Sequence, residues 1–102
     1  MKYAIIILYS ILSFSSVYAG DDSQIATALK LSDDFSTYQD IFISISDKLI
    51  KTGKCSLSEF AEMGGWVRSQ NHKPKPIYFT YCGGMHRNNR IYINVVTGET
   101  FK

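Results

Sequence analysis

Apolar residues recur at helical spacing in the first half of the chain. One stripe repeats at intervals of three and four residues, and it comprises Phe35, Tyr38, Phe42, Ile45 and Leu49. Such spacing places all of them on one face of a helix. Ser32 fits the N-cap of this helix, and Gly53 fits the left-handed position after its end. Segment 32–53 is therefore expected to be the main helix, although "IFISIS" (41–46) also alternates with period two, which keeps a strand as the alternative there.

Two shorter helices are expected on either side of the main one. "DDSQIATALKL" (21–31) carries Ile25, Ala28 and Leu29 at helical spacing. In "CSLSEFAEMGG" (55–65), Ser56 is followed three residues later by Glu59, which is the pattern of a capping box, and Gly64 is a stop signal. The acidic pairs at 21–22 and 33–34 stand at helix starts, where the helix dipole accounts for them.

After Gly65 the pattern changes to short β-type runs separated by turn residues. The runs are "WVRSQ", "IYFTYC", "RIYINVV" and "TF", and the connections between them are "NHKPKP", "GGMHRNN" and "TGE". This alternation predicts a three- to four-stranded antiparallel meander. Together with the preceding segments it predicts an α+β fold, with two or three N-terminal helices packed on one face of the sheet.

The order of helices followed by a meander resembles, in topology, the modules of β-lactamase-inhibitor-like proteins and of small envelope-assembly lipoproteins. The resemblance rests on the order of segments 21–65 and 66–101. It implies a binding role for this chain.

The first residues have the pattern of an export signal. Lys2 precedes an apolar stretch at 4–12, and Val17 and Ala19 stand at the positions that signal peptidase reads. Residues 1–19 are therefore expected to be a signal peptide, and residues 20–102 a single small domain that is periplasmic or secreted, without stable membrane insertion. An uncleaved membrane anchor is the alternative, because the segment 3–20 is free of charge.

The chain contains two cysteines, Cys55 and Cys82. In an exported chain of this length, an even pair is typical of a structural disulfide. Closing that loop stabilises the fold by roughly 3–4 kcal/mol in the chain-entropy description. The disulfide would tie the start of the third helix to the end of a strand.

Charge is distributed unevenly. Residues 20–50 contain six Asp and two Lys, whereas residues 51–102 contain eight Lys or Arg and three Glu. A basic C-terminal half favours an acidic partner. Nucleic acid is not expected as a partner, because the chain is exported.

No catalytic or cofactor motif occurs at the required spacing. His72 and His86 stand among cations without a neighbouring carboxylate, so both are expected to be surface histidines. The glycines of "GGMHRNNR" (83–90) lack the Lys-Ser/Thr of a phosphate loop and are expected to serve the hairpin connection. We therefore expect a protein without enzyme activity, cofactor or metal.

The strand "IYFTYC" has aromatic residues on both faces. If Cys82 turns inward to meet Cys55, then Ile77, Phe79 and Tyr81 point outward; in the opposite orientation the exposed residues are Tyr78 and Thr80. Either arrangement leaves aromatic surface uncovered by a helix layer. A tyrosine with a buried ring and a wet hydroxyl explains such a surface as well as a binding patch does. The candidate binding residues are Trp66, Phe79, Tyr81, Met85, Arg87, Arg90 and Tyr92.

Three functions are compatible with these patterns. The first is an exported module that binds an envelope or secreted protein, in the manner of an inhibitor or immunity protein. The second is a structural accessory subunit of a secretion or conjugation assembly, and the third is a small hydrolase. A homodimer is compatible with the first two.

Overall fold

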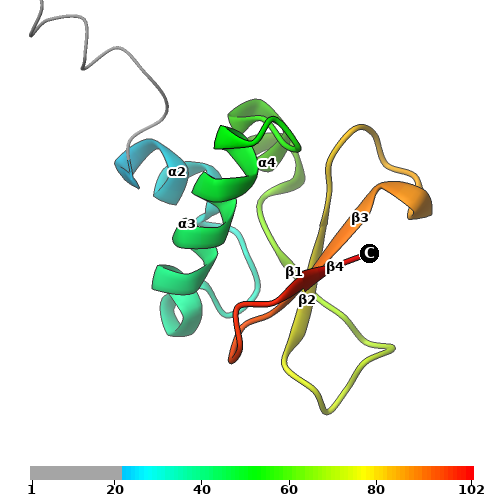
Figure 1. The fold of residues 1–102 in the computed structure, drawn as a ribbon. Coiled ribbons are helices and arrows are strands. Elements are labelled where there is room, and N and C mark those ends of the chain that lie inside the picture. The colour runs from blue at the N-terminus through cyan, green and yellow to red at the C-terminus, as the bar shows by residue number, and fades with distance from the viewer. Residues whose placement is uncertain (1–21) are drawn as a thin grey trace, which may run out of the picture.

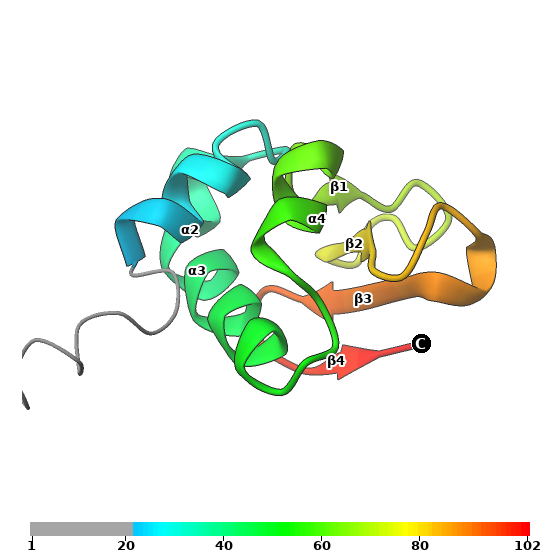
Figure 2. The same ribbon diagram turned by 90° about the horizontal axis from the view of Figure 1, so that it is seen from above.

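A computed structural model describes residues 22–102, in which three helices pack against a four-stranded antiparallel sheet. Figures 1 and 2 show the helices gathered on one side of the sheet. This confirms the expected α+β fold. The elements are α2 (Asp22–Leu29), α3 (Phe35–Lys51), α4 (Leu57–Met63), β1 (Val67–Arg68), β2 (Ile77–Tyr81), the 3-10 helix η1 (Arg87–Asn89), β3 (Arg90–Asn94) and β4 (Thr100–Phe101).

The expected signal peptide at 1–19 lies outside the described residues. Among residues 22–102, none of the helices has the length and apolar character needed to cross a membrane.

Helix α3 is the expected main helix, and the alternative of a strand at 41–46 is wrong. Its N-terminus differs from expectation. Asp34, in the left-handed region with φ 56°, is the N-cap, so the assignment of that role to Ser32 is wrong. Ser32 does not cap the helix because its hydroxyl accepts a hydrogen bond of 2.8 Å from the N–H of Trp66, a residue distant in the sequence. At the other end, Gly53 has the expected positive φ of 79°.

Helix α4 begins with the expected capping box. Ser56 Oγ accepts a hydrogen bond from the Glu59 N–H, and Glu59 Oε1 accepts one from the Ser56 N–H. These bonds satisfy amide groups that a helix start otherwise leaves unpaired. Gly64 ends the helix in the left-handed conformation, as its position predicts.

The strands follow one another in the order β1-β2-β3-β4. Val67 lies opposite Phe79, Phe79 opposite Tyr92, and Tyr92 opposite Phe101. Directly opposed residues in an antiparallel sheet share a face. One row of side chains therefore crosses all four strands on the side away from the helices.

The core lies between the helices and the inner face of the sheet. Tyr78 and Thr80 of β2 and Ile91 and Ile93 of β3 all point into it and are buried. The Cys55–Cys82 disulfide is present, as expected, and joins the start of α4 to the end of β2. Cys82 shares its face of the strand with Tyr78 and Thr80. The disulfide therefore lies on the inner side, and Phe79 and Tyr81 point outward. Ile77, expected on the exposed face with them, is buried.

Candidate functional site

The outer face of the sheet carries four aromatic residues from three strands. Because side chains alternate along a strand, Phe79 and Tyr81 of β2 share this face with Tyr92 of β3 and Phe101 of β4. All four are half-buried. We call the set formed by His72, Phe79, Tyr81, Arg90, Tyr92 and Phe101 the aromatic face.

Arg90 lies at the centre of one half of the aromatic face. Its guanidinium carbon is 4.4 Å from the ring centre of Phe79 and 5.3 Å from that of Tyr81. Nε donates a hydrogen bond of 2.7 Å to the Tyr81 hydroxyl, and Nη1 donates one of 3.3 Å to the Tyr92 hydroxyl. The hydrogen bonds to Tyr92 and to Tyr81 raise the pKa of Arg90 above its usual value. Three rings therefore fix the guanidinium in one orientation.

The guanidinium keeps donors for a ligand. Arginine has five N–H donors, and the two tyrosines use two of them. Within residues 22–102 no carboxylate forms an ion pair with Arg90; the ion pair in that part of the chain is Lys51 with Asp47. The four described strands also contain no acidic residue. A carboxylate from outside could therefore bind to Arg90 without displacing an internal one.

The second half of the aromatic face is formed by Tyr92, Phe101 and His72. The rings of Tyr92 and Phe101 stack with centres 5.3 Å apart, and the His72 ring lies edge-on to both, at 5.1 and 6.1 Å. A contact of 2.6 Å between His72 Nδ1 and Ser69 Oγ fixes the imidazole. The loop before β2 thus folds back over the edge of this face.

Phe101 and His72 do not belong to the surface that the sequence predicts. For Phe101 the missed signal is the strand register, since "TF" pairs with "YI" of β3 only once the turn at 95–99 is placed. For His72 the sequence carries no such signal, because its position depends on how the loop containing Pro74 and Pro76 folds.

Trp66 was expected on the binding surface, and this is wrong. It is completely buried. Its ring stacks on Phe42 at 6.1 Å and packs against Phe60 at 5.9 Å, and Nε1 donates a hydrogen bond of 2.9 Å to Ser46 Oγ. Trp66 precedes β1, where the chain passes directly under the helices, so the indole enters the core instead of extending the sheet surface.

Met85 and Arg87 are both exposed, in the connection between β2 and β3. Met85 lies at a hollow of about 80 Å³ whose lining includes Glu59 and Glu62 of α4. The Glu59 carboxylate accepts a hydrogen bond from the Gly83 N–H, which is the main cause that lowers its pKa. Tyr81 lines the same hollow, so Met85 lies at an acidic end of the molecule that adjoins the aromatic face.

The aromatic face contains a contact between a hydroxyl and an imidazole, formed by Ser69 and His72. Ser69 is buried, and the imidazole lies edge-on to Tyr92 and Phe101. A hydrolase needs such a pair open to a substrate. In the part of the chain that the structure describes, no three metal-ligating side chains come together.

Comparison of the chain with protein-family models, with curated proteins and with solved structures gives no match. The site is therefore interpreted from its own geometry.

Proposed function

We propose that this protein is an exported, non-enzymatic module that binds an acidic protein of the envelope or the secreted fraction, in the manner of an inhibitor or immunity protein. The aromatic face is the binding surface. The observation that carries the proposal is Arg90, which three rings hold in place on the side of the sheet away from the helices and which has no carboxylate partner within residues 22–102.

The composition of the surface supports this function. Tyrosine, phenylalanine and arginine are enriched at protein interfaces, and rigid rings lose little conformational entropy when a partner binds. Exposed cations flank the aromatic face, namely Lys73 and Lys75. An acidic patch on the partner would meet Arg90 at the centre and these lysines at the rim.

The place of action follows from the expected signal peptide. Cleavage after Ala19 would release residues 20–102 into an oxidising compartment, and the Cys55–Cys82 disulfide is compatible with such a compartment. N-terminal sequencing of the exported protein would give Gly20. A membrane-bound product that begins at Met1 would contradict release.

Affinity capture with the mature protein tests the function. The bait is compared with Phe79→Ala, with Arg90→Ser, and with Leu31→Ala as a control, because Leu31 is 75% exposed on the helical side of the molecule. We expect one partner to be retained by the wild type and by Leu31→Ala. Because central anchors in an interface commonly contribute about 2 kcal/mol or more, both face variants should lose that partner.

The identity and behaviour of the captured protein separate the alternatives. A soluble acidic protein in a one-to-one complex would support an inhibitor- or immunity-like role, and co-purification with a large membrane assembly would point to an accessory subunit. Self-association alone would indicate a homodimer. Equal retention by all four baits would contradict binding through the aromatic face.

A further inference from the structure

The two edges of the sheet differ in how their backbone groups are used. At the β1 edge, Arg68 N–H donates to Asp33 Oδ2 at 2.8 Å, and Asp33 N–H donates to the Trp66 carbonyl at 2.9 Å. Trp66 N–H donates to Ser32 Oγ. The turn between α2 and α3 therefore occupies three of the outward-facing groups of this edge, which are the Trp66 N–H and carbonyl and the Arg68 N–H, and it blocks the approach of a further strand.

At the opposite edge, β4 is open. Tyr92 lies opposite Phe101, and Asn94 N–H donates to the Glu99 carbonyl. In an antiparallel pair the bonded positions alternate, so the backbone groups of Phe101 face β3 and those of Thr100 face outward. Thr100 is exposed, and its N–H and carbonyl have no partner within residues 22–102. This edge can accept another strand.

A hollow of about 440 Å³ lies beside this edge, on the helical side. Leu49 of α3 and Ile91 of β3 contribute its apolar wall, and Lys54 and Lys102 line it as well. Figure 2 shows the end of α3 close to β4. A side chain that projects inward from an added strand would enter this hollow.

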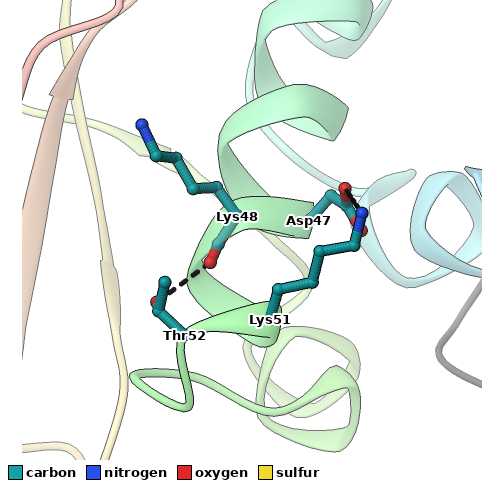
Figure 3. A network of polar contacts seen from close by, with 4 residues as sticks. All are labelled: Asp47, Lys48, Lys51 and Thr52. Atoms are coloured by element: carbon teal, nitrogen blue, oxygen red, sulfur yellow. Dashed lines mark hydrogen bonds and ion pairs between the residues drawn. The ribbon is translucent and has the colours of Figure 1, made fainter.

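Charge indicates the kind of strand that fits. Lys54 and Lys102 are both exposed, and Lys102 Nζ donates only to the Asn88 carbonyl. Lys51 Nζ forms an ion pair of 2.9 Å with Asp47. Figure 3 shows this pair, with Lys48 pointing away from it. Glu99, immediately before β4, is the acidic residue next to this edge in the sequence. Cations dominate this edge, so two copies joined through β4 would bring like charges together.

We propose that an extended acidic segment of the protein partner adds to β4 as a fifth strand. Thr100 N–H and C=O pair with its backbone. Alternate side chains of the segment enter the hollow beside Leu49 and Ile91, and the others lie next to Phe101 at the border of the aromatic face. This mode of binding rests on the proposed function, and it adds the conformation and the charge of the bound segment.

A synthetic peptide of alternating valine and glutamate is the probe, titrated into the 15N-labelled mature protein and followed by NMR. We expect the amide signals of Thr100 and Lys102 to shift. A peptide of the same length with lysine in place of glutamate should bind about tenfold more weakly, because it repels Lys54 and Lys102. The glutamate peptide with N-methylated backbone should lose binding, since it lacks the donors for the Thr100 carbonyl.

Two pairs of matched variants sharpen the test. Thr100→Pro removes the outward N–H at a position where an edge strand tolerates proline, and Thr100→Val keeps the N–H. We expect about tenfold weaker peptide binding for the first and little change for the second. Lys54→Glu should weaken binding, whereas Lys30→Glu, the same charge change at the end of α2, should not.

The outcomes distinguish this proposal from the proposed function. If the partner captured by the wild type is lost with Phe79→Ala but retained by Thr100→Pro, then strand addition is overturned and binding by the aromatic face stands. No shift at β4 with millimolar glutamate peptide, or equal binding of its N-methylated form, would overturn strand addition as well. Shifts confined to Arg90 and its neighbouring rings would do the same. Loss of the partner with both variants, with the folded spectrum retained, would support both proposals.

Discussion

The inner and outer faces of the sheet are built from neighbouring residues of the same strands. On β2, the more hydrophobic of two neighbouring residues is not the one that is buried. Thr80 points inward and is completely buried, and its hydroxyl has no hydrogen-bond partner within residues 22–102. Phe79, the next residue, points outward and stays half exposed. Cys82 explains the choice, because its bond to Cys55 turns Thr80 to the inside. The same orientation buries the Tyr78 ring completely, so the inner face gains one aromatic ring while Phe79 stays half exposed.

The largest difference between the faces should appear when a ring is truncated on each. Trp66→Ala removes a completely buried side chain and leaves the Ser46 hydroxyl unpaired, so we expect a loss of about 3–5 kcal/mol in the free energy of unfolding. Phe79→Ala should cost about 1 kcal/mol, the scale of a cross-strand pair. Urea denaturation measures both. Equal losses would mean that the outer face belongs to the core.

Removal of the disulfide tests what holds the inner face in its orientation. The double variant Cys55→Ala with Cys82→Ala should lose roughly 3–4 kcal/mol in the free energy of unfolding, from the entropy of the closed loop. Wild-type protein with added reductant is the control, and it should lose a similar amount. An unchanged midpoint of urea denaturation would show that packing alone orients β2.

The buried hydroxyl of Tyr78 provides a test that depends on pH. Burial, and then the hydrogen bond to Asp34, raise the pKa of Tyr78 from 10.0 to about 12. A raised pKa stabilises the fold below the unfolded value, so this contribution should be complete below pH 10 and lost as pH rises toward 12. Tyr78→Phe should lose about 1–2 kcal/mol in the free energy of unfolding at neutral pH.

At alkaline pH, the stabilities of the wild type and of Tyr78→Phe should depend differently on pH. The difference in stability between wild type and Tyr78→Phe should shrink between pH 10 and pH 12, as urea denaturation at several pH values would show. A constant difference over this range would contradict the raised pKa. Tyr92→Phe, on the outer face, is the control for tyrosines that remain in contact with solvent.

The smallest expected effect has the opposite sign. Thr80→Val replaces the unpaired buried hydroxyl with a methyl group of similar size, and it should raise the free energy of unfolding by about 1 kcal/mol. Thermal unfolding would detect this as a higher midpoint. Partner binding should not change, because Thr80 faces the helices. A destabilised variant would show that the hydroxyl finds a partner in solution.

The sequence allowed the elements to be predicted where the signals are local. The stripe at 35–49, the capping box of Ser56 with Glu59 and the glycine at 53 each depend on neighbours a few residues away. The position of Cys82 reduced the orientation of β2 to two alternatives, and the disulfide in the structure decides between them. These signals are sufficient for the order of helices and strands.

Contacts between distant residues could not be predicted in the same way. Ser32 and Trp66 are 34 residues apart, and their hydrogen bond determines both the start of α3 and the burial of the indole. The sequence makes no prediction for Ser46, which is buried as the hydrogen-bond partner of the Trp66 indole. His72 and Phe101 reach the aromatic face through a loop and a turn whose paths depend on the finished sheet. The candidate site was therefore only partly predictable.

The blocked β1 edge has a consequence for assembly. A sheet with two open edges can stack copies head to tail, and such contacts between unlike surfaces do not close, so they lead to fibres. In this protein the Ser32–Asp33 turn covers the β1 edge, and Gly65 fits against it so closely that an added Cβ would lie 2.0 Å from Ser32 Oγ. Of the two edges of the described sheet, β4 is therefore the open one. The covered β1 edge prevents copies of this protein from stacking head to tail through both edges.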